Sequence, residues 1–598
     1  MSETHHEFGM RRGRIQLKLF SRSLRKREDQ IVLLLSVVIG ALTGLTVVAF
    51  ILLTERLGMR MYPVGSPAWR RVLIPVTGSL GIGYLLYRYF PDARGSGVPQ
   101  TKAALFARQG VITSGTVFGK FFCTAVTLAS GIPLGREGPA VQVGGGIASL
   151  LARRLGLRTE KVKSLLPAGA AAAIAAAFNT PLAAVLFALE EVVGDLHAPV
   201  LGPVVLASAT SWLVLRLLLG NSPLFSVPQY QLVNSVEFGI YAILGVIGGL
   251  ISVAFTRLLL ETRKFFLGLS KKTVWFQPVA GGLLVGLMGW FVPQVLGVGY
   301  GYVGDALNAR MPLELMALLV VLKLLGATIS YGSGNAGGIF GPSLFIGAML
   351  GGTVGGVAHY WFPAYTATPG AYALVGMGTA FAGIVRAPMT SVLMILETTR
   401  DYTVIVPLMI SNLVSFFVSS RLQKEPIYTA LAMQDGIHLP AAETRQRRRQ
   451  RQITQAMKPA AETLPASATV TDAFEWTHSS TLRAWPITEG RDVVGVISAA
   501  ALEQACKEGA GARHLGDLVN QRAFPHVHAD QGLDLALQRM GTEGVDLLPV
   551  VSRGDINKLE GVVCLEDLLR AFGINPAELI FVRAAAKNDI KVHDSREK

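Results

Sequence analysis

Cysteine is scarce in this chain, and charge is also in short supply. The three cysteines, Cys123, Cys506 and Cys564, are scattered over 598 residues without a C-x-x-C pair, so we expect neither disulfides nor a thiolate metal site. The ten histidines form no H-E-x-x-H motif, so the sequence lacks that zinc-protease signature. Charged residues make up 16% of the chain and hydrophobic residues 51%, which is too apolar for a soluble multidomain protein.

Long apolar stretches are present instead. They lie at 31–53, 72–90, 201–219, 238–256, 277–296, 312–330 and 402–420. Each is about long enough to cross a ~30 Å hydrocarbon core as a helix, whereas others, such as 340–357, are short or broken by glycine. The first stretch lacks a small-residue cleavage site, which favours a retained helix over a signal peptide. The sequence thus predicts a multi-pass, all-α membrane domain.

Basic residues give the chain a formal net charge of +15. They gather at the edges of the apolar region, at 11–27 before the first stretch and at 445–451 after the last. The positive-inside rule then predicts that both termini are cytoplasmic, in a bacterial-type plasma (inner) membrane. We expect anionic membrane lipid, and no nucleic acid, to be the partner of these clusters.

The composition changes after the second basic cluster, where strand-like and amphipathic stretches alternate. Two similar segments, GVIS at 495–498 and GVVC at 561–564, each end a predicted strand and begin a predicted helix. This α/β repeat resembles a tandem pair of CBS domains. The predicted division of the chain is a basic segment at 1–30, a transmembrane domain at 31–436, an arginine-rich linker at 437–452, tandem CBS domains at 453–573 and a tail at 574–598.

The membrane region contains a longer repeat. Segments 120–144 and 323–347 carry serine, glycine and proline at equal distances from Lys120 and Lys323, and segments 168–192 and 375–399 match in the same way. A duplicated unit implies a pseudo-twofold axis, with a substrate site near the membrane midplane where the copies meet. The spacing alone fits either a parallel or an inverted repeat.

Glycine-rich breaks lie inside the duplicated region. GREGP at 135–139 and GGIFGP at 337–342 occupy matching places, and GSGVP at 95–99 adds the hydroxyl of Ser96. Proline suits the first turn of a helix and glycine allows close backbone approach, so each break predicts a helix that begins within the membrane. Helix N-termini present unpaired N–H groups and a positive dipole end, which indicates a site for a small anion.

Simpler interpretations remain open for several of these residues. A Gly-Pro pair often marks only a kink, Ser96 could cap its own helix, and Tyr428 could be an interfacial aromatic. Lys120, Arg136 and Lys323 are interpreted as snorkelling or paired structural cations. Glu190 and Glu397 occur in both copies and are interpreted as helix-end or packing residues.

Two glutamates occur in one copy of the repeat but are replaced by other residues in the second copy, and this difference suggests a functional role. Glu137 matches Phe340 in the other copy, and Glu191 matches Thr398. A carboxylate within the membrane is a candidate for proton transfer. In its charged form, Glu137 could also occupy the anion's place, because a carboxylate satisfies the same N–H groups. It would then act as both gate and proton carrier.

These motifs, in this order, resemble the CLC family of chloride channels and chloride/proton exchangers. GSGVP, GREGP, GGIFGP and the terminal PIYTAL at 426–431 cover about 31–436, and the CBS pair follows. The resemblance implies a homodimer with a pore in each subunit, and an inverted repeat of tilted, broken helices. Departures are small and include Gly341, where alanine is common.

The resemblance also implies roles for individual residues. Ser96 and Tyr428 would hold chloride with their hydroxyls, and the backbone amides of Ile339 and Phe340 would complete the site. Glu137 matches the gating glutamate. Glu191 matches the internal proton-transfer glutamate, which is typical of exchangers. The expected function is therefore chloride/proton antiport rather than catalysis, with a chloride preference implied by Ser96.

A passive voltage- or pH-gated chloride channel is the nearest alternative to antiport. An intramembrane protease with CBS domains would need a metal motif, and helix N-termini would repel the substrate of a magnesium transporter. No cofactor or metal is expected in the membrane domain.

The CBS pair predicts one weak adenine-nucleotide site. Family members that bind nucleotides place an aspartate six residues after the glycine that ends the strand, where it accepts hydrogen bonds from the ribose. The second repeat has Asp567 there, whereas the first has Ala501. Asp567 could equally serve only its own helix, since aspartate is favoured near helix N-termini.

Overall fold

The structure is a computed structural model, and it is described here outside residues 1–3, 197–199, 221–222, 229, 231, 401, 440–450, 461, 479, 481, 491, 520–523 and 575–598. Side chains are described from Gln30 onward. Most of the predicted linker and nearly all of the predicted tail lie outside the described residues, as do the side chains of both basic clusters apart from Arg451. The chain forms two compact units, 1–439 and 440–598.

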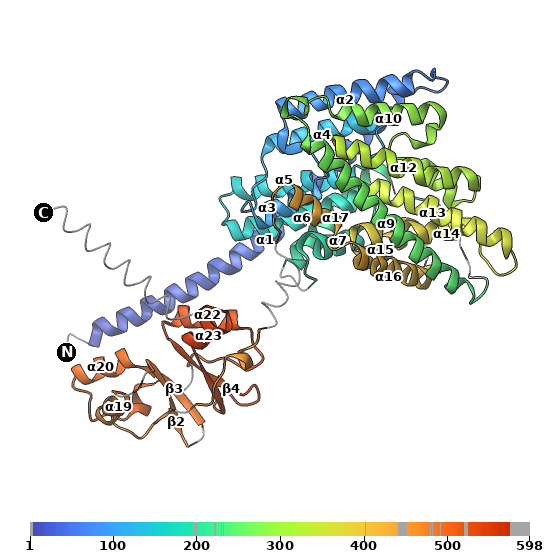
Figure 1. Ribbon diagram of the computed structural model, residues 1–598. Helices are drawn as coiled ribbons and strands as arrows, with labels where there is room; N and C mark the ends of the chain where they lie inside the picture. The colour runs from blue at the N-terminus through green and yellow to red at the C-terminus, as the bar shows by residue number, and fades with distance from the viewer. Residues whose placement is uncertain are drawn as a thin grey trace. The chain divides into compact units, whose positions relative to one another are not determined.

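The first unit is built from helices (Figure 1). Their bounds are α1 Thr4–Met61, α2 Arg70–Arg88, α3 Val98–Phe106, α4 Ser114–Ala129, α5 Glu137–Arg154, α6 Thr159–Phe178, α7 Pro181–Phe187, α8 Leu201–Leu219, α9 Glu237–Gly268, α10 Pro278–Phe291, α11 Tyr300–Leu307, α12 Leu313–Ser333, α13 Phe340–Trp361, α14 Pro369–Val385, α15 Pro388–Thr399, α16 Ile405–Leu422 and α17 Ile427–Gln434. Short turns are η1 Pro91–Ala93, η3 Lys271–Thr273 and η4 Pro293–Val295, and a π-helical turn, η2, spans Ala188–Val193.

The apolar stretches predicted as spans are helical in the structure, but two of them, 72–90 (α2) and 277–296, are not among the helices that could cross a membrane by length and composition. By length and composition, seven helices of the described residues could cross a membrane. The stretch at 277–296 is only a 14-residue helix, α10, followed by η4. Two of the seven, α6 and α13, were not among the predicted stretches.

The expectation that 340–357 is short or broken was wrong, because α13 is a continuous helix of 22 residues. Its glycines face α14 closely. An ideal Cβ on Gly347 would lie 2.3 Å from the Gly376 carbonyl oxygen, and one on Gly351 would lie 2.0 Å from the Tyr372 carbonyl oxygen. These glycines therefore allow two helix backbones to touch, as small residues commonly do between membrane helices. The core of the unit runs along α5, α6, α13 and α14, most of whose residues are buried.

Equivalent residues of the two copies meet around a pseudo-twofold axis. The N–H of Gly135 donates to the carbonyl of Gly338, and the N–H of Gly338 donates to the carbonyl of Gly135, both at 2.7 Å, in an antiparallel bridge. Because the two glycines hold the same place in their copies and exchange identical bonds, the axis passes between them. Antiparallel pairing of equivalent segments is what a twofold relation between the copies requires.

The second unit contains two α/β repeats (Figure 1). The first repeat has β1 Leu464–Pro465, α19 Val470–Thr477, β2 Ala484–Glu489, β3 Asp492–Ser498 and α20 Ala499–Lys507, and the second has α22 Leu533–Glu543, β4 Leu547–Val551, β5 Leu559–Cys564 and α23 Leu565–Ala571. A turn, η5 Ile453–Gln455, precedes both, and a short helix, α21 Leu515–Leu518, lies between them. The strands form a β1-β2-β3 sheet and a β4-β5 pair.

The predicted strand-to-helix junctions of this unit are confirmed. Ser498 ends β3 and caps α20 by accepting a hydrogen bond from the Ala501 N–H at 3.3 Å. Cys564 ends β5 and precedes α23 without a side-chain cap. Leu502 and Leu568, which follow at the same spacing, are both fully buried in their own repeats.

Candidate functional site

Three helices of the membrane unit begin at one place. The Gly135–Gly338 bridge sets the first residues of α5 and α13 beside each other. The start of α3 touches the start of α5, since an ideal Cβ on Gly97 would lie 2.2 Å from the Gly138 carbonyl oxygen. Gly97 also has a φ of +105°, which a residue with a side chain rarely adopts. Together the three N-termini concentrate unpaired N–H groups and positive dipole ends.

The two hydroxyls predicted for the anion site are brought together at these helix starts. Ser96 precedes α3, Tyr428 lies in α17, and both side chains are fully buried. They are close enough to interact, yet neither Ser96 Oγ nor Tyr428 Oη makes a geometrically satisfactory hydrogen bond in the described part of the chain. Buried hydroxyls are normally hydrogen-bonded, so this pair fits the binding of an anion as acceptor.

Ile339 and Phe340 lie fully buried at the start of α13, where the resemblance places them. The Phe340 ring packs among three others, with centroid distances of 4.9 Å to Phe178, 5.6 Å to Phe187 and 4.3 Å to Phe381. This helix start is therefore buried beside a cluster of aromatic rings, and a hydrogen bond in a buried, low-dielectric place is stronger than one in water.

Glu137 is the first residue of α5 and is fully buried. Its Oε1 accepts a hydrogen bond from the Tyr300 hydroxyl, whereas Oε2 has no hydrogen-bond partner among the described residues. Oε2 lies against the glycines of both breaks, because an ideal Cβ would approach it to 2.4 Å from Gly135 and 3.4 Å from Gly341. A side chain at Gly135 would therefore crowd the carboxylate, whereas one at Gly341 would only touch it.

Glu191 lies in the π-helical turn after α7 and pairs with a residue that the sequence analysis missed. The Lys102 Nζ is 2.6 Å from Glu191 Oε1, and both side chains are almost fully buried. Lys102 lies one turn into α3, the helix that follows Ser96. In the sequence, the only signal for Lys102 is that it follows the GSGVP motif closely, in GSGVPQTK at 95–102. Tyr428 is near enough to both Glu137 and Glu191 to interact with them electrostatically.

The charged residues interpreted as structural make reciprocal contacts between the copies. Glu190 accepts hydrogen bonds from the N–H groups of Met389 and Thr390 at the start of α15. Glu397 accepts them from Leu182 and Ala183 at the start of α7. Each glutamate thus caps a helix of the other copy, which confirms the helix-end interpretation.

The duplicated lysines are fully buried, so they do not snorkel. Lys120 donates to the carbonyls of Ala93 and Gly95, just before α3. Lys323 donates to the carbonyls of Val295 and Gly297, just before α11. Each lysine holds the loop that leads into a short helix.

Arg136 lies beside Tyr300 and is mostly buried. Its guanidinium carbon is 5.6 Å from the Tyr300 ring centroid, and its Nη1 is 3.9 Å from Glu55 Oε1. These contacts match the interpretation of Arg136 as a paired structural cation.

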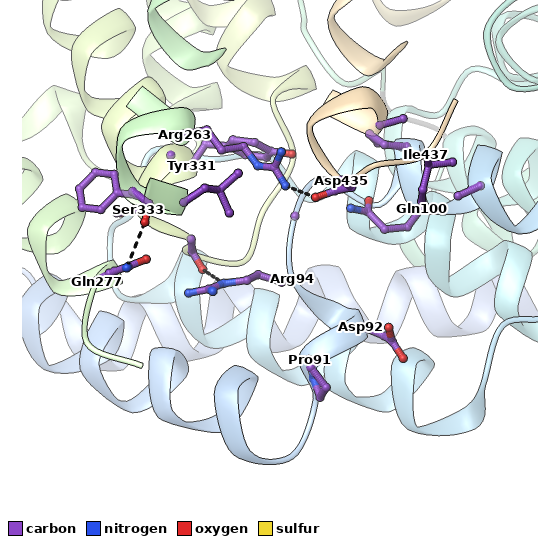
Figure 2. Close-up of a pocket in the computed structure, with 18 of the residues that line it drawn as sticks. Pro91, Asp92, Arg94, Gln100, Arg263, Gln277, Tyr331, Ser333, Asp435 and Ile437 are labelled. Atoms are coloured by element: carbon purple, nitrogen blue, oxygen red, sulfur yellow. Dashed lines mark hydrogen bonds and ion pairs between the residues drawn. The ribbon is translucent and has the colours of Figure 1, made fainter. Parts of the chain in front are cut away.

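Two cavities approach the helix starts. The Arg94 cavity, of about 340 Å³, includes Arg94, Gly95, Tyr331 and the ion pair of Arg263 with Asp435 (Figure 2). The Tyr331 hydroxyl accepts a hydrogen bond of 3.2 Å from the Ser96 N–H, so this cavity reaches the Ser96 loop. The Tyr300 cavity, of about 530 Å³, is lined by residues including Tyr62, Tyr300, Tyr302 and Asp305. It reaches Glu137 through Tyr300, so the two cavities approach the site through different residues.

Asp567 lies in the first turn of α23, in the second unit. Its Oδ1 is 2.6 Å from the Lys458 Nζ, and its side chain is 11% exposed. Burial and the neighbouring Asp567 raise the pKa of the Cys564 thiol to about 11, so the thiol stays protonated near neutral pH. Among the described residues, no group of three His, Cys, Asp or Glu side chains could hold a metal ion.

Comparison with known proteins places this geometry in a family. The family model described as voltage gated chloride channel matches residues 77–420, and the CBS domain model matches 515–574. A Vibrio campbellii protein named H(+)/Cl(-) exchange transporter ClcA is 33% identical over 416 residues, covering 67% of this chain and 88% of the relative. A Salmonella arizonae protein of the same name is 32% identical over 437 residues, covering 71% and 92%.

Solved structures agree with the fold. The chain matches a slow cyanobacterial Cl⁻/H⁺ antiporter with a TM-score of 0.63 and 27% identity, covering 68% of this chain and 97% of the other. It matches a eukaryotic CLC transporter with a TM-score of 0.58 and 20% identity, covering 90% and 97%, a likeness of fold alone. The chain belongs to the voltage-gated chloride channel (CLC) family and carries a CBS unit after its membrane domain.

Proposed function

We propose that this protein is a chloride/proton antiporter in which Ser96, Tyr428 and the amides of Ile339 and Phe340 hold chloride. One observation carries the proposal. At the meeting point of three helix starts, two buried hydroxyls and the buried Oε2 of Glu137 lack hydrogen-bond partners among the described residues. Such a site suits an anion and a carboxylate that competes with it, and protonation removes the charge of the competitor.

Antiport is favoured over a passive channel by the second carboxylate. Glu191 is buried and paired with Lys102, so it can hold a negative charge until a proton arrives. Several matching relatives are named as exchangers, and the matched cyanobacterial structure is titled an antiporter.

Simultaneous chloride and pH recording on the purified protein in liposomes tests the proposal. An outward chloride gradient should drive proton uptake against a proton gradient, and an imposed pH gradient should drive chloride movement. Chloride flux without linked proton movement would favour the channel. No chloride flux from a correctly folded protein would remove the site assignment altogether.

We propose further that the protein is a homodimer in a bacterial inner membrane, with both termini cytoplasmic and anionic lipid around it. The family resemblance and the two basic clusters support this arrangement. The exposed apolar residues of α8, such as Leu213 and Leu217, suit either lipid or a second subunit. Chemical cross-linking in native membranes tests the dimer, and protease access to each terminus in sealed vesicles tests the sidedness.

For the CBS unit we propose one weak adenine-nucleotide site that uses Asp567. The carboxylate is mostly buried and already paired with Lys458, so a ribose would have to share it with that lysine. Calorimetric titration of the full chain with ATP, ADP and AMP tests the site. Asp567→Asn should abolish binding, and Glu566→Gln, on the same helix but 69% exposed, should not. Absence of heat with all three nucleotides would leave the unit without this role.

A further inference from the structure

Tyr300 lies between the Tyr300 cavity and the carboxylate of Glu137. It lines the cavity, and its hydroxyl donates to Glu137 Oε1. Its ring stands edge-on to Phe225 at a centroid distance of 5.7 Å, and the Arg136 guanidinium lies over it at 5.6 Å. The phenol is therefore fixed on several sides, with its one donor directed at the proposed gate.

The loop before Tyr300 is also fixed. Lys323 holds the carbonyls of Val295 and Gly297, and its Nζ lies 4.3 Å from the centroid of the Phe345 ring. Gly299, which precedes α11, has a φ of +82°, and an ideal Cβ there would lie 2.7 Å from Phe345. Tyr300 thus begins a helix whose starting position is set by a buried cation and an aromatic wall.

Comparison of the two copies shows what is particular to Tyr300. Gly97 and Gly299 both precede a short helix with positive φ, and each follows a loop held by a buried lysine. The first residue after this glycine is Val98 in one copy and Tyr300 in the other. The second copy has therefore placed a hydrogen-bond donor where the first has a hydrocarbon side chain. That donor meets Glu137, itself a carboxylate that the copies do not share.

We propose that Tyr300 is a positioning residue that latches the Glu137 gate at the helix starts. The proposal rests on the chloride/proton function proposed above. The Tyr300 hydroxyl stabilises the ionised carboxylate and holds it over Gly135 and Gly341, where it competes with chloride. Chloride must displace the carboxylate, which requires the Tyr300–Glu137 hydrogen bond to break. The strength of the Tyr300–Glu137 hydrogen bond therefore affects the apparent affinity of the site for chloride.

Chloride binding to the full-length protein tests the latch. Tyr300→Phe removes only the hydroxyl, so the carboxylate competes less well and the apparent chloride Kd should fall roughly ten-fold, on the scale of a hydrogen bond to a charged group. Tyr302→Phe is the matched control, since Tyr302 lies in the same helix and lines the same cavity. It should leave the Kd unchanged.

A mutant cycle separates latching from a general structural effect. In a Glu137→Gln background the charged competitor is gone, so Tyr300→Phe should then change the Kd less than two-fold. An equal effect in both backgrounds, or an unchanged Kd in the wild-type background, overturns the latch. If Tyr300→Phe is not monodisperse, Tyr300→His provides the second variant. Its ring can still donate, so it should keep the Kd closer to wild type than Tyr300→Leu does.

Failure of the latch differs from failure of the transport function. If wild-type liposomes couple chloride to protons while the Kd of Tyr300→Phe stays unchanged, the latch is wrong and the function stands. If the wild type shows no coupling, the antiport function is wrong, and the mutant cycle still reports whether Tyr300 governs competition between Glu137 and chloride.

Discussion

At the scale of the residue, the membrane unit keeps polar atoms buried and leaves a few of them unsatisfied. The amino groups of Lys120 and Lys323 are buried away from water, but each donates hydrogen bonds to two backbone carbonyls. The hydroxyls of Ser96 and Tyr428 have no such hydrogen-bond partner among the residues that the structure describes. An unsatisfied buried polar group costs about 1–3 kcal/mol, so hydroxyls that remain unpaired at a shared point indicate a ligand rather than a packing need.

Replacing Glu137 by glutamine should preserve chloride flux and abolish coupled proton movement. The amide has the shape of the protonated acid but cannot take up or release a proton. Paired chloride and pH electrodes on liposomes measure both fluxes. Glu55→Gln is the control, because Glu55 is exposed and lies near Arg136 rather than at the helix starts. Chloride-driven proton pumping by Glu137→Gln would contradict the assignment of Glu137 as proton carrier.

Replacing Lys102 by methionine should destabilise the protein and slow proton transport more than chloride transport. The substitution leaves Glu191 buried and unpaired, and breaking a buried pair commonly costs about 3–5 kcal/mol. Thermal unfolding in detergent and proton flux measure the two effects. Lys163→Met, which breaks the exposed pair with Glu160, should cost less than about 1 kcal/mol.

The double variant sharpens this prediction. Glu191→Gln together with Lys102→Met removes both charges, so it should recover most of the lost stability while remaining defective in proton transport. If the stability lost in the double variant equals the sum of the losses in the Lys102→Met and Glu191→Gln single variants, the ion pair is not what stabilises this region.

At the scale of the element, glycine decides where helices touch. The same contact occurs once in each copy. An ideal Cβ on Gly144 would lie 2.2 Å from the Gly169 carbonyl oxygen, and one on Gly347 would lie 2.3 Å from the Gly376 carbonyl oxygen. The helix pairs α5–α6 and α13–α14 are therefore packed backbone to backbone, and they carry the two central helix starts.

Alanine at Gly144 or at Gly347 should destabilise the protein by similar amounts. Neither carbonyl oxygen can move without shifting its helix, so we expect about 1–3 kcal/mol for each, as for other overpacked sites. Thermal unfolding in detergent measures the loss. Gly239→Ala, in α9, has no atom within 4 Å of the added Cβ and should cost nothing. A markedly smaller loss at one of the two sites would show that the copies are packed differently there.

Sequence patterns predicted the outward-facing helices better than the inner ones. Stretches such as 201–219 are rich in leucine, and only 28% of the α8 window is buried. For α6 and α13 the buried shares are 83% and 78%. Alanine and glycine fill these inner helices because close packing requires small side chains, and such residues give a weak hydropathy signal.

Parts of the site were predictable from the sequence where a motif occurs in both copies of the repeat, or where a charged residue occurs in only one of them. The duplicated breaks indicated the helix starts, and the unmatched carboxylate indicated Glu137. Tyr300 and Lys102 could not be found in this way, because their contacts join residues far apart in the sequence. Short helices such as α11 and the π-helical turn fix those contacts, and neither leaves a periodic pattern.

At the scale of the whole molecule, the chain forms two compact units, and the proposed sites are divided between them. Every residue placed at the anion site precedes the boundary after Leu439, and Asp567 lies beyond it. The first unit has its own core, and each repeat of the second unit has its own smaller one. Transport chemistry and any nucleotide response therefore belong to different parts of the chain.

A chain truncated after Leu439 should still exchange chloride for protons, because it retains the complete anion site, Glu137 and Glu191. Any effect of adenine nucleotides on the rate should be lost. Liposome flux with and without ATP measures both properties, and the full-length Asp567→Asn variant controls for nucleotide binding outside the CBS unit. Loss of exchange in a monodisperse truncated protein would show that the second unit is required for transport itself.

The reciprocal Gly135–Gly338 bridge has a consequence for the history of the chain. Equivalent groups exchanging identical bonds form an isologous contact, the kind that two separate copies of a half-length ancestor would make when inserted in opposite directions. A pair of identical halves carries every side chain twice, so it offers two glutamates at the axis or two phenylalanines. Two halves that are joined in one chain are free of that constraint. One half carries the acid of Glu137 while the other carries the hydrocarbon of Phe340, so the two sides of a symmetric scaffold differ chemically at the axis.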